Sequence, residues 1–409
     1  MFGTDIWQEI FHTIKKNKLR TFLTSFSMAW GIFMLVLLLG SGTGLENGIQ
    51  KQFADDAVNS IWVRPGVTSI PYKGFQAGRR VQFTNEDVDL AKDKIEGVDK
   101  LTARFGMWGQ EMSYGNEYST YSLRGTHPDH KYLENTIIAK GRFLNELDLQ
   151  RQRKITVIGK TVEEQLYKGK DAMGTYLEIK GIPFKVVGVF TDEGNPREME
   201  CVYVPITTAQ RVFNGGNTIR YLMFTVGDAS FDESVVIADN TEEFYAQRHS
   251  ISDQDPRALN ISNNMEEFKR VSDLMLGIRA FIWIIGIGTI VAGVVGVSNI
   301  MMIVVKERTR EIGVRKALGA SPWSVIKLIV LEAVLITSFA GYLGLLAGVG
   351  LLEAVRLNAP PSDFFVNPGV DFGVAVSTTV LLIIAGSAAG LFPAMKAARI
   401  LPIEALRDE

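Results

Sequence analysis

The chain contains four long stretches that are almost free of charged residues. A helix needs about 20 apolar residues to cross the hydrocarbon layer of a bilayer, and each stretch is at least that long. The alternative, four buried core helices of one soluble protein, is disfavoured because four such lengths rarely coincide in a soluble chain. We therefore predict four transmembrane helices, at residues 21–44, 279–305, 324–352 and 372–394.

The segments between these helices predict an orientation. Short loops rich in Lys and Arg usually face the cytoplasm. Basic residues gather in an amphipathic segment at 1–20, in the loop 306–323 and in the tail 395–409, whereas the loop 353–371 has one arginine against three carboxylates. No clear cleavage site follows the first helix, so we interpret it as an uncleaved anchor. Both termini are expected in the cytoplasm, and the loop 353–371 outside.

The large segment 45–278 has the pattern of a folded domain. Apolar and polar residues alternate as in strands, and Pro and Gly mark turns. The pattern predicts strands at 60–64, 155–158, 176–180, 184–190 and 221–226, and helices at 86–95 and 161–167. The length suffices for two small α/β subdomains. The predicted fold class is a membrane protein of α+β type, with a large mixed α/β domain inserted between transmembrane helices 1 and 2.

Helical periodicity continues on both sides of this domain. Apolar residues recur at intervals of three or four, as on one face of a helix, at Leu45, Ile49 and Phe53 and again at Ile261, Met265, Phe268, Val271 and Met275. These segments are either ordinary helices of the domain or a stalk that carries motion out of the membrane.

Composition narrows the function. The chain has 43 basic and 45 acidic residues, and its slightly acidic balance argues against a mainly electrostatic nucleic-acid binder. Residues 46–278 alone hold 28 basic and 34 acidic residues, a charge of −6, and this acidity suits an external domain. The single cysteine, Cys201, excludes an intramolecular disulfide and any zinc site built on thiolates.

Three motifs in this domain could suggest chemistry. Gly159-Lys160-Thr161 resembles the end of a phosphate-binding loop, but lysine occupies position 154, where the loop requires glycine, so we predict a plain strand-to-helix turn. His127 and His130 could share a metal, but the chain has only four histidines, and a solvated loop is the favoured interpretation. Cys201 lies in a strand-like run and is expected to be a small buried hydrophobic residue.

The predicted spans contain few ionisable groups. Only Glu332 lies clearly within one, and it is expected to bond to a neighbouring helix or to reach the interface; alone it is a poor proton relay. Small residues repeat at intervals of four, which favours close helix packing, at Gly40/Gly44, Gly288/Ala292/Gly296, Gly344/Gly348 and Gly386/Gly390.

The most distinctive segment follows the second span and reads KERTREIGVRKALGAS, residues 306–321. Glu311 and Arg315 stand four apart in the order that supports a helix, and Val314 and Leu318 form an apolar edge. Gly319 can end the helix, and Ser321-Pro322 can begin the next one. We predict a short charged helix suited to docking a soluble partner; the alternative is a loop that only touches anionic lipid.

This segment, with SNIMMIVV before it and FPAMKAARILPIEALR after the fourth span, resembles the membrane subunit of ABC transporters of the MacB/FtsX/LolC type. The stretch from Gly141 to Phe190 is similar to the MacB-like periplasmic core domain. The resemblance implies a permease of the bacterial inner (plasma) membrane that has no catalytic residues, metal or cofactor of its own. It also implies that a separate ATPase subunit binds the ATP. MacB carries a fused ATPase before its first span, and this chain is expected to lack one.

The resemblance also assigns residues and partners. It implies that the helix between spans 2 and 3 couples to the ATPase, through Glu307, Arg308, Thr309, Arg310, Glu311, Ile312, Gly313, Arg315, Lys316, Leu318, Gly319 and Ala320. The expected partners are that ATPase, a second copy or a paralogous permease, a periplasmic adaptor with an outer-membrane factor, and membrane lipids; no nucleic acid is expected. The leading hypothesis is export by mechanotransmission. The alternatives are an FtsX-like regulator of a cell-wall hydrolase and a lipoprotein-releasing permease.

Overall fold

The computed structural model describes residues 18–54, 56–192, 198–358, 362, 365–370 and 372–401. Most of the predicted segments 1–20 and 395–409 lies outside the described residues. The chain divides into two compact units, a helical unit of residues 1–49 and 274–409 and an α/β unit of residues 50–273.

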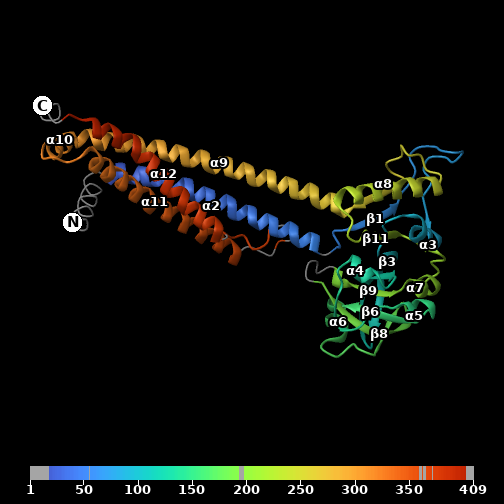
Figure 1. The fold of residues 1–409 in the computed structure, drawn as a ribbon. Helices are drawn as coiled ribbons and strands as arrows, with labels where there is room; N and C mark the ends of the chain where they lie inside the picture. Colours follow the sequence, from blue (N-terminus) through green and yellow to red (C-terminus); the bar gives the residue numbers. More distant parts are fainter. Residues whose placement is uncertain are drawn as a thin grey trace. The chain divides into compact units, whose positions relative to one another are not determined.

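Four helices of the helical unit are long and apolar enough, among the described residues, to cross a membrane. They are α2 (Lys18–Ala54), α9 (Asn264–Glu307), α11 (Pro322–Asn358) and α12 (Phe372–Arg399), and the short α10 (Thr309–Ala317) separates α9 from α11 (Figure 1). α2 and α9 extend beyond the charge-free stretches. They include Leu45, Ile49 and Phe53 in α2 and the periodic residues from Met265 onward in α9.

Glycines allow close approach between these helices. A Cβ added to Gly344 would lie 2.2 Å from the Ala29 carbonyl oxygen, and one added to Gly386 would lie 2.1 Å from the Thr337 hydroxyl. The predicted packing role is confirmed at these two positions. Within this chain Gly288 and Gly296 have open space beside them, because Gly286 and Gly293 are the α9 glycines that face α2, so packing by Gly288 and Gly296 stays a prediction for a second copy.

A ten-stranded mixed sheet forms the frame of the α/β unit. Its order is β12-β1-β11-β3-β4-β9-β6-β8-β5, with β7 paired to β3 and β8. The strands are β1 (Ser60–Pro65), β3 (Leu101–Tyr114), β4 (Glu117–Thr126), β5 (Ile137–Gly141), β6 (Ile155–Gly159), β7 (Tyr176–Ile179), β8 (Ile182–Thr191), β9 (Cys201–Pro205), β11 (Tyr221–Thr225) and β12 (Leu259–Asn263). β2 (Phe83–Thr84) and β10 (Thr218–Ile219) form a separate pair.

The long strand β3 joins the two halves of this sheet. Its first residues pair with β11 and its later residues with β4, and the register shifts between Met107 and Gln110. β4 pairs with β9 and β6 with β8 in parallel, and all other pairs in this sheet are antiparallel. Each half therefore has its own hydrophobic cluster on a shared sheet.

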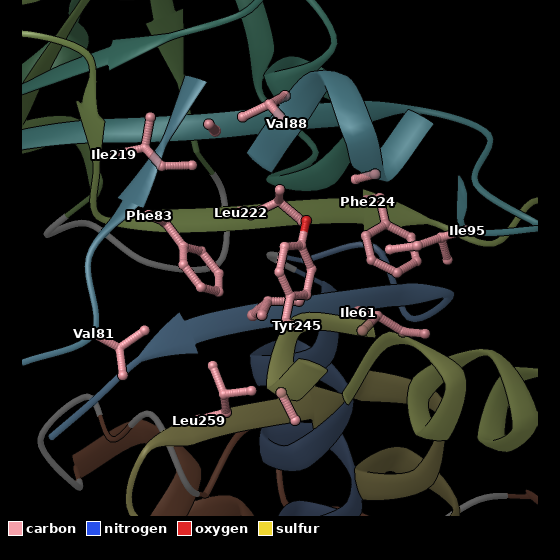
Figure 2. Close-up of a cluster of buried hydrophobic side chains, with 14 of the residues drawn as sticks. Ile61, Val81, Phe83, Val88, Ile95, Ile219, Leu222, Phe224, Tyr245 and Leu259 are labelled. Carbon is pink, nitrogen blue, oxygen red and sulfur yellow. The ribbon is translucent and has the colours of Figure 1, made fainter. Parts of the chain in front are cut away.

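The helices of this unit cover the sheet and connect its strands. Tyr245 of α8 packs among Phe83, Leu222 and Phe224, with its ring centroid 4.7 Å from that of Phe83 (Figure 2). The helices are α3 (Asn85–Lys94), α4 (His130–Leu133), α5 (Glu146–Gln150), α6 (Lys160–Tyr167), α7 (Ile206–Val212), α8 (Phe231–Arg248) and the 3-10 turn η1 (Glu198–Glu200). The predicted strands and helices of this domain are all present.

One part of the helical periodicity was misassigned. Ile261 lies in strand β12, opposite Val63 of β1, and α9 begins only at Asn264. The backbone hydrogen bonds between β12 and β1 place Ile261 in the sheet. The sequence did not reveal this, because a helical and a strand-like spacing of apolar residues cannot be distinguished over so short a run.

Candidate coupling site

The segment predicted to couple to an ATPase forms α10 at the end of the helical unit. α9 ends at Glu307, and α10 begins at Thr309 after Arg308, whose carbonyl accepts a bond from the Ile312 amide at 2.9 Å. Gly319 has a φ of +100° and donates its amide to the Lys316 carbonyl, so it ends α10 as expected. The Ser324 amide donates to the Ser321 hydroxyl at 3.3 Å, which places Ser321 before the first turn of α11.

One face of α10 is attached to the bundle. Ile312 and Gly313 are buried, and Ile312 packs in a cluster with Val305, Val325 and Ala397 from α9, α11 and α12. The Lys316 ammonium donates to two carbonyls at the end of α12, those of Ala398 at 2.8 Å and Ile400 at 2.7 Å. Lys316 therefore caps the α12 C-terminus, where the helix dipole favours a cation.

A buried ion pair makes a second attachment. The Arg308 guanidinium lies 3.3 Å from the Glu332 carboxylate of α11, whose side chain is 3% exposed. Glu332 thus bonds to a neighbouring helix, one of the two roles expected for it. Sequence reasoning missed the identity of the partner, although a lone carboxylate in an apolar span is itself the signal that a cation from another helix should be sought.

The other face of α10 is exposed. Glu311 and Arg315 pair at 2.8 Å across one turn, as their spacing predicts. Arg310, Val314 and Leu318 are also exposed, and Leu318 is 85% accessible. Glu307, Gly319 and Ala317 complete the exposed surface, whereas Thr309 and Ala320 are partly covered. The twelve predicted residues thus sort into an attached face and an open face that carries charge beside an apolar edge.

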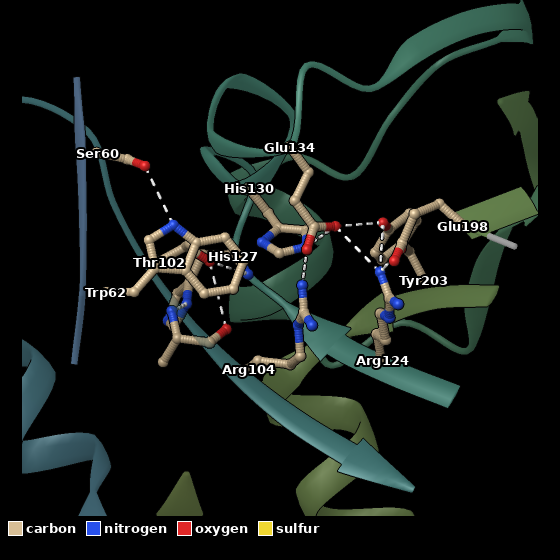
Figure 3. Close-up of polar contacts among 11 residues, drawn as sticks. Ser60, Trp62, Thr102, Arg104, Arg124, His127, His130, Glu134, Glu198 and Tyr203 are labelled. Atoms are coloured by element: carbon tan, nitrogen blue, oxygen red, sulfur yellow. Dashed lines mark hydrogen bonds and ion pairs between the residues drawn. The ribbon is translucent and has the colours of Figure 1, made fainter. Parts of the chain in front are cut away.

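A buried polar cluster lies in the α/β unit, beside a further hydrophobic cluster to which Tyr203, Phe143 and Phe190 belong. The Glu134 carboxylate pairs with Arg104 of β3 and accepts a bond from the Tyr203 hydroxyl of β9 at 2.6 Å, and Arg124 of β4 bridges it to Glu198 (Figure 3). Burial lowers the pKa of Arg104 to about 10. The arrangement ties β3, β4 and β9 together.

The interpretation of His127 and His130 as a solvated loop was wrong. The His130 side chain is fully buried beside Glu134, and the Nδ1 atom of His127 accepts the Ala103 amide at 3.1 Å. Burial lowers the pKa of His127 to about 4 and the pKa of His130 well below its usual value. The chain folds back on β3 here, which no local pattern signals. No cluster of metal-ligating side chains occurs among the described residues.

The other two motifs of this domain have the predicted structures. Gly159 ends β6 and Lys160 begins α6, where the Lys160 ammonium pairs with Glu163 at 2.6 Å. A Cβ on Gly159 would lie 2.0 Å from the Met199 carbonyl oxygen, so this glycine serves packing. Cys201 is buried, and burial raises the pKa of its thiol.

Comparison with known proteins accounts for both units. The MacB-like periplasmic core domain family matches residues 21–236, and the FtsX-like permease C-terminal family matches residues 283–402. The chain belongs to the family of MacB-type permeases. The predicted resemblance and fold class are thereby confirmed. With the four apolar helices, this membership indicates an ABC permease component of the inner membrane with a periplasmic domain.

The relatives differ in length. The macrolide export ATP-binding/permease protein MacB of Bdellovibrio bacteriovorus is 27% identical over 98% of this chain, which spans 61% of that protein. An uncharacterised ABC transporter permease of Methanocaldococcus jannaschii is 27% identical over 99% of this chain and 98% of its own length. The solved periplasmic region of MacB from Actinobacillus actinomycetemcomitans superposes with a TM-score of 0.44, at 17% identity, over 54% of this chain and 95% of that one. This chain thus spans about three fifths of the MacB relative named here.

Proposed function

We propose that this chain is the permease subunit of an ABC transporter, and that ATP hydrolysis on a separate ATPase subunit moves it through α10. The proposed orientation has both termini and α10 in the cytoplasm and the α/β unit in the periplasm. It is supported by the basic residues near α10, among them Lys306, Arg310 and Lys316. The domain boundaries of this proposal are those predicted from the sequence, with 306–323 as the coupling segment.

The observation that carries the proposal is the two-sided construction of α10. Its attached face is bonded to α11 through Arg308 and to α12 through Lys316. Its open face presents Glu311, Arg315 and Leu318. A partner that binds the open face would therefore move two membrane helices with it, because packed interfaces shift as units and do not deform continuously.

The same proposal covers the route of the substrate. Movement of α2 and α9 would change the periplasmic unit, which would then expel a periplasmic substrate, with an adaptor and an outer-membrane factor as further partners. A second copy, or a paralogous permease, would complete the moving unit. This route needs no polar path across the membrane, which agrees with the single carboxylate, Glu332, recognised within the spans.

The decisive experiment exchanges the charges of the open face. The double variant Glu311→Arg with Arg315→Glu keeps a pair four residues apart, so α10 should stay folded while the charge pattern that a partner meets is inverted. The chain is co-expressed with a candidate ABC ATPase subunit and purified by an affinity tag. We expect the recovered ATPase to fall about tenfold, and the ATPase activity that depends on the permease to fall with it.

The matched control is the same exchange at Glu266 and Arg270, an exposed pair of identical spacing at 3.1 Å near the start of α9. It should leave ATPase recovery unchanged. Full ATPase recovery and full nucleotide-dependent movement of the α/β unit in the α10 variant would show that α10 does not couple the two proteins. Recovery of a cell-wall hydrolase in place of an adaptor would favour the regulatory alternative.

A further inference from the structure

A cavity of about 290 Å³ lies between the end of α9, α10 and the first turns of α11. Apolar side chains form most of its wall, among them Met301 and Val304 of α9 and Leu328 and Leu331 of α11. Arg308, Arg315 and Lys327 supply cations, and Glu311 and Glu332 supply carboxylates. The lining therefore has a net charge of +1.

Polarity changes along the length of this cavity. Met301 of α9 stands seven residues before Arg308, the residue that follows α9, and Ser324 and Leu331 stand seven residues apart on α11. Each spacing corresponds to about 10 Å along a helix. The end toward α10 is polar and cationic, and the wall beyond it is apolar except for Glu332, which Arg308 neutralises. An occupant that matches this wall has an anionic end and an apolar end.

We propose that this cavity binds a glycerophospholipid with an anionic headgroup. The headgroup phosphate would lie toward Arg315 and Lys327, and an acyl chain would cover Val304, Leu328 and Leu331. Basic pockets between membrane helices attract such headgroups, and the apolar wall distinguishes a lipid from free phosphate. The inference needs only the membrane location of the chain and is independent of any ATPase partner.

Occupancy of this cavity would bear on α10. Arg308 and Ile312 line the cavity and also attach α10 to the bundle. A lipid bound here would therefore contact the side chains that hold α10 in place, and the composition of the bilayer would influence how firmly α10 is held. Most lining residues come from α9, α10 and α11, so a bound lipid would contact all three helices.

The test is native mass spectrometry of the full chain purified in detergent, with palmitoyl-oleoyl phosphatidylglycerol or phosphatidylcholine added. We expect a preference for phosphatidylglycerol of about fivefold, because one basic residue near a membrane surface contributes roughly that factor. Lys327→Gln should abolish the preference, whereas Lys327→Arg should keep it. Lys396→Gln is the matched control, since Lys396 lies near the end of α12 and does not line the cavity.

Several outcomes would overturn the proposal. One is equal binding of the two lipids by the unmodified chain, and another is a preference that survives Lys327→Gln. Full displacement of the lipid by glycerol 3-phosphate would show that the site takes only the phosphate group. Lipid retained by monomers and absent from dimers would show that a second copy fills the cavity.

Retention of phosphatidylglycerol with a lower affinity after Leu331→Asn would support the assigned acyl wall.

Discussion

Glu332, in the apolar span of α11, forms an ion pair with Arg308, the residue between α9 and α10, at 3.3 Å. The two residues lie 24 positions apart in the sequence, and the Glu332 side chain is buried whereas that of Arg308 is half-buried. The pair joins α10, the helix proposed to receive motion from a partner, to α11, one of the four apolar helices. The following predictions start from this pair and from the contacts that surround it.

Replacing Glu332 should weaken the helical unit. Glu332→Gln leaves the half-buried Arg308 guanidinium without its carboxylate, which we expect to lower the free energy of unfolding by about 2 kcal/mol. The measurement is denaturant unfolding of the full chain in detergent. Because a hydrophobic replacement of both partners avoids the uncompensated charge, Glu332→Leu with Arg308→Met should recover most of the loss.

The control for this change lies on the same helix. Glu353 pairs with Arg356 at 2.5 Å near the other end of α11, with both side chains about half exposed. Glu353→Gln should change stability by less than about 1 kcal/mol, since exposed pairs contribute little. If Glu332→Gln lowered the free energy of unfolding no more than Glu353→Gln does, the contact between Glu332 and Arg308 would not stabilise the helical unit.

Lys316 should control how tightly α10 is attached to α12. Lys316→Met removes both donors to the Ala398 and Ile400 carbonyls while keeping a long apolar stem. We expect hydrogen exchange to become several-fold faster in α10 and at the end of α12, since these segments would open locally at lower free energy. Exchange measured by mass spectrometry tests this, with exposed Lys306→Met as the control. An unchanged exchange rate in both segments would contradict the capping role.

Gly344 should tolerate no side chain. A Cβ at this position would lie 2.2 Å from the Ala29 carbonyl oxygen, so Gly344→Val must push α11 away from α2. Overpacking of this kind costs about 1–3 kcal/mol, which should appear as a lower melting temperature. Gly296→Val in α9 has open space beside it and should leave the melting temperature close to that of the unmodified chain. Equal melting temperatures of the two variants would exclude tight α2–α11 packing.

Acid should weaken the α/β unit through Asp87. Burial opposes ionisation of this carboxyl, but bonds from the His249 and Arg248 side chains and the Thr84 amide hold its pKa at about 2, below the ordinary value of 3.8. The folded state therefore binds the proton less readily than the unfolded state. Its stabilisation is complete above pH 4 and is lost as the pH falls toward 2, by about 2 kcal/mol in total.

The measurement for Asp87 is the free energy of unfolding of the full chain between pH 5 and pH 2. Asp87→Asn should be less stable at pH 5 and should lose about 2 kcal/mol of the acid-dependent change. Asp89→Asn changes an exposed carboxyl in the same helix α3 and serves as the control. An identical pH profile for Asp87→Asn and the unmodified chain would refute the assigned contacts.

The sequence alone determined the features that depend on neighbouring residues. Charge-free length predicted the four long helices, and the Glu311/Arg315 spacing, Gly319 and Ser321-Pro322 predicted the limits of α10 and the start of α11. These features are local, because a helix is set by residues three or four apart and ends where a glycine or proline interrupts it. The sequence therefore predicted where the candidate coupling helix lies, but not which residues of the other helices it contacts.

Tertiary structure decided which distant groups meet. It paired Arg308 with Glu332, directed Lys316 to the α12 carbonyls, turned Gly288 and Gly296 away from the other helices and buried His130 beside Glu134. It also drew Ile261 into a strand. Each outcome depends on an element far along the chain, because the free energy of burying a charge or filling a gap is set by the atoms across the contact and not by the residue's own neighbours in sequence.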